Sequence, residues 1–330
     1  MRIALGIRGH SKILGILKEH LPEDEFVEFD ANDVAERTRD CAVIIPIVTP
    51  VSEQILQDPS LSLVQQYGVG LDIVDVVVAT RSGVLVANVP SVGSGNAESV
   101  AELAIAHMLM LCRQIPTSFE RFRERRFSSP LGECLWQSTV VILGYGGIGQ
   151  EIARRLAGFG VRVIAVSRHG PNGSRERDLT VRLDRHVAQH ELSSVLGEAD
   201  FLVVAAPATP DNIGLVNKDV LARVRPSAYI VNIARGPVIE YDALLSALRE
   251  GRIAGAGLDV FWQEPFDPLD ALLEQNVIAT PHIGGATGRS LVGIGKIVAR
   301  NIEAVRAGNM PDHCANPQVW PLWLARRNAP

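Results

Sequence analysis

The stretch TVVILGYGGIGQEIARRL, residues 139–156, determines the fold expected for this chain. It begins with a continuous apolar run, passes through Gly144-x-Gly146-x-x-Gly149, and continues with helical periodicity. Gly144 permits a tight turn, Gly146 lets the backbone approach a pyrophosphate, and Gly149 permits close packing of helix and strand. The helix N-terminus then offers free N–H groups and a positive dipole end to phosphates. The pattern predicts a dinucleotide-binding turn; the alternative is a glycine-rich turn without a ligand.

Short β-branched runs recur on both sides of this motif. They are continuously apolar, as is typical of strands covered by helices on both faces of a parallel sheet. Segments with helical periodicity lie between them, so strand and helix alternate and an α/β fold follows. The expected strands are residues 2–7, 41–48, 61–67 and 84–89, then 139–143, 161–166, 201–206, 228–233 and 276–280.

Two long segments with helical character divide the chain. Residues 96–113 are apolar nearly all round, which predicts a buried helix between the two series of strands, with Asn96 as a candidate cap. Residues 289–308 predict a second long helix, followed by a tail that contains Pro and Trp. A chain that crosses into a second domain and then returns would explain both helices.

Composition limits the possible partners and the compartment. With 32 basic and 37 acidic side chains and a net charge of −5, nothing in bulk electrostatics favours binding of nucleic acid or of an anionic membrane. The four cysteines show no metal-ligand spacing, which predicts no metal site and a reducing compartment. No apolar run reaches the ~18 residues of a membrane span, and no cleavable leader is evident, so we expect a cytoplasmic protein.

The strand VRVIAVSRHG, residues 161–170, ends where the dinucleotide-binding fingerprint places an acid for the ribose 2′-hydroxyl of NAD. Ser167 and Arg168 stand there instead. An acid would repel a 2′-phosphate, whereas serine does not, and Arg168 could pair with it. We therefore expect NADP(H) to be favoured over NAD(H). The alternative is a solvated Arg168 that stacks on adenine beside either cofactor, and the role of His169 stays open.

Three downstream stretches carry candidate chemistry: VNIARGPVIE (231–240), GLDVFWQEPFDP (257–268) and ATPHIGGATG (279–288). Arg235, Glu264 and His282 each follow a strand-like run, at the edge where open parallel sheets bind ligands. Such a trio suits hydride transfer to a 2-keto acid. Arg235 would grip the substrate carboxylate and polarise the ketone. His282 would exchange the proton, and Glu264 would hold the imidazole and favour its protonated form. Taken singly, each could be an ordinary loop residue.

These motifs, with QYGVGLDIVD (66–75) and NVPSVGSGNAESVAELAIAHML (88–109), resemble the D-isomer-specific 2-hydroxyacid dehydrogenases, in that family's order and over most of the chain. The resemblance implies two doubly wound parallel-sheet domains. One is a central Rossmann NAD(P)-binding domain at 101–286, and the other is a flavodoxin-like substrate domain formed from 1–100 and 287–330. It also implies a homodimer that associates through the 96–113 region.

The resemblance further implies roles for individual residues. The family's catalytic Arg, Glu and His fall on Arg235, Glu264 and His282, and the amides of Val69 and Gly70 would bind the substrate carboxylate. Asp259 would face the nicotinamide carboxamide, unless it is a turn cap. The cofactor site so implied comprises Tyr145, Gly146, Gly147, Ile148, Ser167, Arg168, Ala206, Pro207, Ile233, Ala234, Asp259, His282 and Gly284.

Substrate identity is weakly specified. Members of the family similar at Ser167 are NADPH-dependent glyoxylate/hydroxypyruvate reductases, which is the activity we expect. Ile47 and Val48 would form an apolar wall that favours small or aliphatic 2-keto acids, and Trp262 would either narrow the site or pack. Trp136 replaces the small turn residues usual before the nucleotide strand. The alternatives are a non-catalytic, corepressor-like nucleotide sensor and an NAD-dependent enzyme resembling phosphoglycerate dehydrogenase. The physiological direction stays open.

Overall fold

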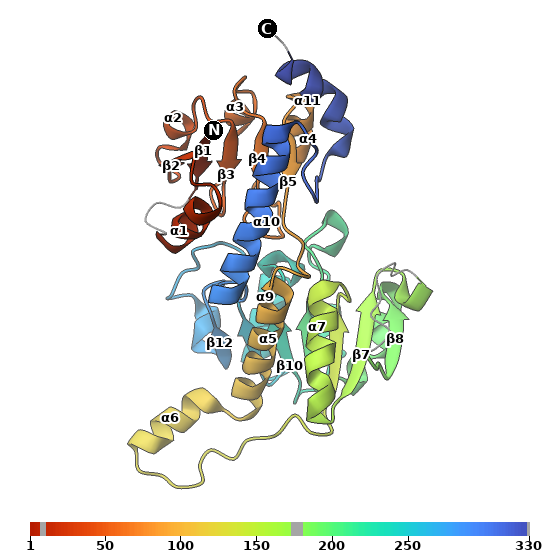
Figure 1. Ribbon diagram of the computed structural model, residues 1–330. Coiled ribbons are helices and arrows are strands. Elements are labelled where there is room, and N and C mark those ends of the chain that lie inside the picture. The colour runs from red at the N-terminus through yellow and green to blue at the C-terminus, as the bar shows by residue number, and fades with distance from the viewer. Residues whose placement is uncertain (7–10, 173–180, 329–330) are drawn as a thin grey trace. The chain divides into compact units, whose positions relative to one another are not determined.

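The computed structural model describes residues 1–6, 11–172 and 181–328. The chain forms two compact units (Figure 1): unit 1 comprises Met1–Asn96 and Thr287–Pro330, and unit 2 comprises Ala97–Ala286. The boundary expected at residue 100 lies inside helix α5 (Asn96–Cys112), whereas the structural division falls at the start of that helix. Among the described residues, no helix is long and apolar enough to cross a membrane.

Unit 2 is built on a seven-stranded, fully parallel sheet with the order β12-β11-β10-β9-β6-β7-β8. The chain starts in the middle of the sheet at β6, adds strands on one side, and then returns to add strands on the other side beginning with β9. This reversal is the switch point of a Rossmann sheet, outside whose carboxyl ends ligands bind. The strands are β6 (Thr139–Leu143), β7 (Arg162–Ser167), β8 (Arg185–Ala188), β9 (Phe201–Val204), β10 (Tyr229–Asn232), β11 (Gly255–Leu258) and β12 (Val277–Ala279).

Both faces of this sheet are covered, as the continuously apolar strands predicted. Val140 and Ile142 of β6 pack on one face with α5 and α7 (Gly147–Leu156), while Val141 and Leu143 pack on the other with α8 (Lys218–Leu221) and α9 (Tyr241–Arg249). Helix α6 (Ile115–Arg123) contributes no buried residue. The remaining connections of unit 2 contain 3-10 turns: η1 (Ala157–Phe159), η2 (Gly170–Asn172), η3 (Gln189–Ser194), η4 (Leu196–Glu198), η5 (Pro210–Asn212), η6 (Gly236–Val238) and η7 (Ala271–Glu274).

Unit 1 has a five-stranded parallel sheet with the order β2-β1-β3-β4-β5, which is the flavodoxin-like arrangement expected. Its strands are β1 (Arg2–Leu5), β2 (Glu25–Glu28), β3 (Val43–Ile45), β4 (Leu63–Gln65) and β5 (Leu85–Ala87). Its helices are α1 (Ser11–His20), α2 (Val34–Arg37), α3 (Glu53–Leu56), α4 (Val76–Arg81), α10 (Gly288–Ala307) and α11 (Trp320–Arg327), with the 3-10 turn η8 (Pro317–Val319).

The C-terminal segments complete the core of unit 1. Ile294 and Val298 of α10 pack in one hydrophobic cluster with Ile3 and Leu5 of β1. The tail that had no evident place in the sequence forms α11, whose buried Trp323 donates its indole N–H to the carbonyl oxygen of Ser62 at 3.1 Å. The two chain ends therefore fold together.

Three strands of the structure were not among the runs expected from the sequence: β2, β8 and β11. The first two lie at sheet edges and carry charged residues, so the apolar signal is weak. The third has the sequence GAGL, in which neighbouring side chains leave no room for a Cβ at either glycine. A Cβ at Gly255 would lie 2.6 Å from the Asn276 side chain, and one at Gly257 would lie 2.8 Å from Cβ of His107.

Candidate active site

The strands of unit 2 end in register. Leu143, Val204, Asn232, Leu258 and Ala279 are aligned across β6, β9, β10, β11 and β12. The segments that follow them leave the sheet at one edge, and Ser167 closes β7 one residue beyond the partner of Leu143. The unit 2 residues singled out in the sequence all lie in the glycine-rich βα turn or at this edge: Tyr145, Gly146, Gly147, Ile148, Ser167, Arg168, Ala206, Pro207, Ile233, Ala234, Arg235, Asp259, Glu264, His282 and Gly284.

The three glycines of the loop after β6 have distinct environments. Gly144 has φ +102°, and a Cβ there would lie 2.4 Å from the backbone nitrogen of Ala206. A Cβ at Gly149 would lie 2.2 Å from the carbonyl oxygen of Gly144. A Cβ at Gly146 would meet nothing within 4 Å. Gly146 therefore leaves open space beside the N-terminus of α7, where a pyrophosphate fits the free amides and the positive helix end.

At the end of β7, Ser167 contacts a residue that the sequence did not single out. Its hydroxyl donates to the carbonyl oxygen of Gly170 at 3.2 Å, and its Oγ lies 2.8 Å from Nε2 of His186 on β8. The His186 ring meets the ring of Tyr145 edge-on, with centroids 5.3 Å apart. Because the Ser167 proton is directed at Gly170, Oγ is left to accept from an Nε2–H of His186. Only the pairing register of β7 and β8 could have revealed this contact.

Arg168 and His169 extend from the same strand end into solvent. An Nη atom of Arg168 lies 3.6 Å from a carboxylate oxygen of Asp211, and both side chains are largely exposed. Such an exposed pair contributes little and competes weakly with other ligands for the guanidinium. His169 is exposed.

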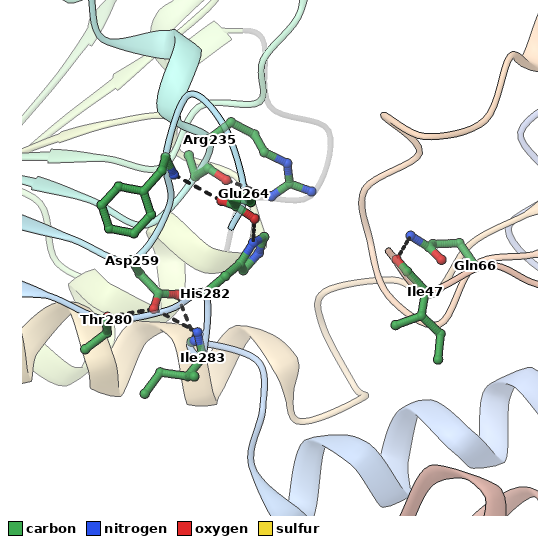
Figure 2. A network of polar contacts seen from close by, with 11 residues as sticks. Ile47, Gln66, Arg235, Asp259, Glu264, Thr280, His282 and Ile283 are labelled. Carbon is green, nitrogen blue, oxygen red and sulfur yellow. Dashed lines mark hydrogen bonds and ion pairs between the residues drawn. The ribbon is translucent and has the colours of Figure 1, made fainter. Parts of the chain in front are cut away.

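His282 and Glu264 form a hydrogen-bonded pair (Figure 2). Nδ1 of His282 lies 2.6 Å from one carboxylate oxygen of Glu264, and the other oxygen accepts the backbone N–H of Phe261 at 3.0 Å. Burial favours the neutral carboxyl, but the hydrogen bond and charge of His282, the Phe261 amide and the charge of Arg235 together hold the pKa of Glu264 below its ordinary value. Glu264 is thus an anion that accepts from Nδ1 and leaves Nε2 for other partners.

The backbone of His282 adopts an unusual conformation that Asp259 supports. Its φ is +52°, in the left-handed region that side chains other than glycine rarely adopt. Asp259, 2% exposed, accepts the amides of Ile283 and Gly284, one on each oxygen, both at 2.8 Å. It also accepts the hydroxyl of Thr280 at 2.7 Å. Asp259 therefore caps the loop on both sides of His282, and Thr280 is a further residue that the sequence did not single out.

Arg235 is brought beside Glu264 by two features of its own segment. The buried Asn232 accepts the amide of Ala234 at 3.1 Å and donates to the carbonyl oxygen of Arg235 at 3.0 Å, which shapes the turn after β10. A Cβ at Gly236 would lie 2.1 Å from the carbonyl carbon of Phe261, so only glycine lets the loops after β10 and β11 touch. Figure 2 shows the guanidinium next to Glu264.

Trp262 packs rather than shaping a substrate surface. Its indole N–H donates to the carbonyl oxygen of Ile239 at 2.6 Å, and its ring meets Tyr241 edge-on at 5.1 Å. It lies against the hydrophobic core on the α8 and α9 side of the sheet. Of the two interpretations of this residue, the structure supports packing.

In unit 1, the residues singled out lie after β3 and β4. Val69 is 38% exposed and lies beside Gly70, and its carbonyl oxygen accepts the side-chain amide of Asn88 at 2.6 Å. Ile47 has φ +57°, unusual for a β-branched residue, and its carbonyl oxygen accepts the side-chain amide of Gln66 at 3.0 Å (Figure 2). Gln66, missed in the sequence, thus ties the loop that carries Ile47 and the exposed Val48 to the segment after β4.

Comparison with known proteins gives the class of this chain. Residues 105–284 match the model of the D-isomer specific 2-hydroxyacid dehydrogenase NAD-binding domain. The chain is 35% identical over 310 residues to glyoxylate reductase of Pyrococcus furiosus, which covers 90% of this chain and 88% of the relative. The chain therefore belongs to the D-isomer specific 2-hydroxyacid dehydrogenase family, as the motifs indicated, and is an NAD(P)-dependent oxidoreductase.

Two further similarities refine this placement. The solved structure of an NADPH-dependent glyoxylate/hydroxypyruvate reductase from Sinorhizobium meliloti, in complex with NADP and malonate, has a TM-score of 0.80 and 32% identity, and covers 97% of each chain. D-3-phosphoglycerate dehydrogenase of Mycobacterium bovis is 37% identical over 275 residues, which are 82% of this chain but only 50% of the relative.

Proposed function

We propose that this enzyme transfers a hydride between NADP(H) and a small D-2-hydroxy or 2-keto acid, in the manner of a glyoxylate/hydroxypyruvate reductase. The observation that carries the proposal is the 2.6 Å pair of His282 and Glu264 beside Arg235, at the carboxyl edge of a Rossmann sheet. A proton donor with an anionic partner, next to a guanidinium, is what reduction of a 2-keto acid requires. The names of the glyoxylate reductase relatives support the substrate class.

The roles proposed for the catalytic residues follow from their contacts. Because Nδ1 of His282 donates to Glu264, Nε2 is the atom that gives a proton to the substrate carbonyl oxygen during reduction and removes it during oxidation. Glu264 orients the ring and favours the imidazolium. Arg235 binds the substrate carboxylate and polarises the ketone, and the amides of Val69 and Gly70 in unit 1 are further donors suited to a carboxylate. NADPH, when bound, supplies the hydride.

The cofactor contacts proposed for this chain divide by chemistry. The amides of Gly146, Gly147 and Ile148 hold the pyrophosphate at the start of α7. Asp259 has three donors on its two oxygens, which leaves one lone pair, on the oxygen that accepts Gly284, for a carboxamide N–H of the nicotinamide. The remaining residues line the cofactor by backbone or apolar contact: Tyr145, Ala206, Pro207, Ile233, Ala234, His282 and Gly284.

The preference for NADP(H) is proposed from the strand end at Ser167. The guanidinium of Arg168 can donate to a 2′-phosphate, and Ser167, which donates to Gly170 and accepts from His186, carries no negative charge that would repel one. The carboxylate of Asp211 beside Arg168 opposes this preference, but the Arg168–Asp211 pair is exposed and weak. The missing acid at position 167 and the weakly paired guanidinium of Arg168 together favour the phosphate.

Paired variants test the cofactor preference. Ser167→Asp and Arg168→Ala should lower kcat/KM for NADPH by about 10- to 100-fold, as loss of a charge-assisted hydrogen bond predicts, and should leave kcat/KM for NADH nearly unchanged. Arg162→Ala is the matched control, because Arg162 is an exposed arginine at the opposite end of the same strand. Equal losses with both cofactors would contradict the proposal.

A substrate panel tests the activity itself. Oxidation of NADPH and NADH is measured with glyoxylate, hydroxypyruvate, pyruvate and a longer 2-keto acid, together with 3-phosphohydroxypyruvate. We expect turnover with the small, unphosphorylated acids. Preferred turnover of the phosphorylated acid with NADH would favour the alternative that resembles phosphoglycerate dehydrogenase. Binding of NADPH without any turnover would favour the corepressor-like sensor.

We further propose that the enzyme is cytoplasmic and forms homodimers. All four cysteines are free, as suits a reducing compartment. Helix α5, where the sequence placed the partner contact, buries ten of its residues within the chain, whereas α6 and the segment after it expose large apolar side chains. In place of the contact expected at 96–113, we propose that the partner contacts α6 and that segment.

A further inference from the structure

A histidine that the proposed reaction does not use is buried beneath the active site. His107, on α5, has no exposed surface. It packs against Gly257 of β11, where any larger residue would place its Cβ 2.8 Å from Cβ of His107. Nε2 of His107 lies 3.1 Å from the hydroxyl oxygen of Thr280. A strand position without a side chain thus makes room for an imidazole, which is costly to bury unless it is hydrogen-bonded.

The hydrogen bonds around His107 run in one direction. The Thr280 hydroxyl donates its proton to Asp259 at 2.7 Å, so its oxygen must accept from Nε2–H of His107. Nδ1 is buried and has no hydrogen-bond partner within the described part of the chain, so a proton placed there would find no acceptor. Burial accordingly lowers the pKa of His107, against the opposing charge of Asp259. The imidazole is neutral and serves as a donor.

This chain of donors ends at the residue that supports the proposed acid/base group. Asp259 receives the Thr280 hydroxyl on the oxygen that also accepts the Ile283 amide, and its other oxygen accepts the Gly284 amide. These two amides directly follow His282, whose backbone is in the left-handed region. Figure 2 shows Thr280, Asp259 and Ile283 in contact below the His282 ring.

We infer that His107 is a positioning residue for His282: through Thr280 it orients the Asp259 carboxylate, and Asp259 holds the backbone that presents the imidazole. The inference rests on the proposed role of His282 as the acid/base. Without the donor at position 107, the Thr280 hydroxyl is free to rotate away from Asp259. The Ile283 and Gly284 amides are then bound to a carboxylate whose orientation is less well defined. The His282 ring is held less precisely in the position that proton transfer requires.

Four variants test the chain of hydrogen bonds. His107→Leu and Thr280→Val remove a donor, whereas His107→Gln and Thr280→Ser keep one. We expect the first two to lower kcat about 10-fold, as loss of one buried hydrogen bond predicts, with KM for the 2-keto acid changed less than about 2-fold. The second two should retain most of kcat. The double variant His107→Leu/Thr280→Val should be no slower than Thr280→Val alone, because both changes break the same chain.

A second readout does not depend on catalysis. Hydrogen exchange at the amides of Ile283 and Gly284 should be faster in His107→Leu and Thr280→Val, because the carboxylate that accepts these amides is less firmly held. Met108→Leu is the matched control, since Met108 is the neighbouring fully buried residue of the same helix. It should leave both exchange and kcat at wild-type values.

The outcomes separate this inference from the proposed function. A wild-type enzyme without turnover on the substrate panel would refute the proposed function, while faster exchange in His107→Leu would still support the positioning of the loop. Wild-type exchange at Ile283 and Gly284 in His107→Leu would overturn the inference whatever the activity. Faster exchange with unchanged kcat would likewise overturn it, because the loop would then move without consequence for His282.

Discussion

The imidazole of His282 is placed by contacts on both sides of a strained backbone. A positive φ at a residue with a side chain costs about 1–2 kcal/mol and persists only when the surroundings impose it. Here Glu264 holds the ring through Nδ1, and Asp259 holds the two amides that follow. The strained residue lies in the segment after β12, and both of its supports come from the segment after β11.

Replacement of His282 by alanine tests its role as the acid/base. We expect kcat to fall by about 10²- to 10⁴-fold, the usual contribution of a positioned proton donor. The dissociation constant for NADPH should stay near the wild-type value, because the phosphates bind elsewhere. Steady-state kinetics and fluorescence titration of NADPH provide the two measurements. His190→Ala, at an exposed position of the same unit, is the control, and unchanged turnover in His282→Ala would remove this residue from the mechanism.

Replacement of Glu264 by glutamine should shift the pH dependence of reduction. The lowered pKa of Glu264 means that the carboxylate is charged at neutral pH and favours the imidazolium that reduction consumes. Glutamine is neutral, so the imidazolium that donates the proton in reduction loses its anionic partner. The pH optimum for reduction should therefore move downward. Glu274→Gln, at an exposed position, is the control and should leave the pH profile unchanged. An unchanged profile in Glu264→Gln would show that the carboxylate has no electrostatic role.

At the scale of the element, the turn from β6 into α7 contains two kinds of glycine. Two are required by backbone packing, and one leaves space for the proposed ligand. A Cβ at Gly144 would lie 2.4 Å from backbone, and a Cβ at Gly149 would lie 2.2 Å from backbone, so neither position can accept a side chain without displacement of the chain. Gly146 has no such neighbour. The two kinds of glycine predict different consequences for the same substitution.

Alanine substitutions at these positions test the division between structural and ligand-binding glycines. Gly149→Ala should lower the Tm of unit 2 by several degrees, at about 2–4 °C for each kcal/mol lost in a domain of roughly 150–250 residues. Gly146→Ala should leave Tm nearly unchanged and weaken NADPH binding by about 10-fold or more, because its methyl group enters the space proposed for the pyrophosphate. Gly158→Ala, which also meets no neighbour, controls for alanine itself. Normal NADPH affinity in Gly146→Ala would argue against that space as the phosphate site.

The same element shows how far sequence reasoning extends. Apolar runs and the glycine spacing were enough to predict β6, α7 and the parallel class of both sheets, because these signals are local. They did not predict β11. Its glycines are required because the side chains of Asn276 and His107, which are distant in sequence, pack directly against the strand. They identified Ser167 but not His186, because that contact depends on the register between β7 and β8.

At the scale of the whole molecule, unit 2 exposes an unusual amount of apolar surface along one segment. Helix α6 projects from the end of α5 and is followed by an extended stretch that returns to β6 (Figure 1). Large apolar side chains along it are exposed: Phe119 by 60%, Phe122 by 83%, Phe127 by 96%, Leu131 by 89% and Trp136 by 64%. Several large exposed apolar side chains gathered on one projecting segment are typical of a protein–protein contact.

Light scattering tests whether a second copy of the chain covers this segment. The wild-type protein should elute with a mass twice the 35.7 kDa of one chain. Phe122→Asp/Phe127→Asp should elute at the single-chain mass, because two desolvated carboxylates at the centre of an apolar contact have no partners. Val77→Asp, at an exposed apolar position on α4 of unit 1, is the control and should keep the doubled mass. A wild-type monomer would refute the dimer, and a dimeric double variant would place the contact away from α6.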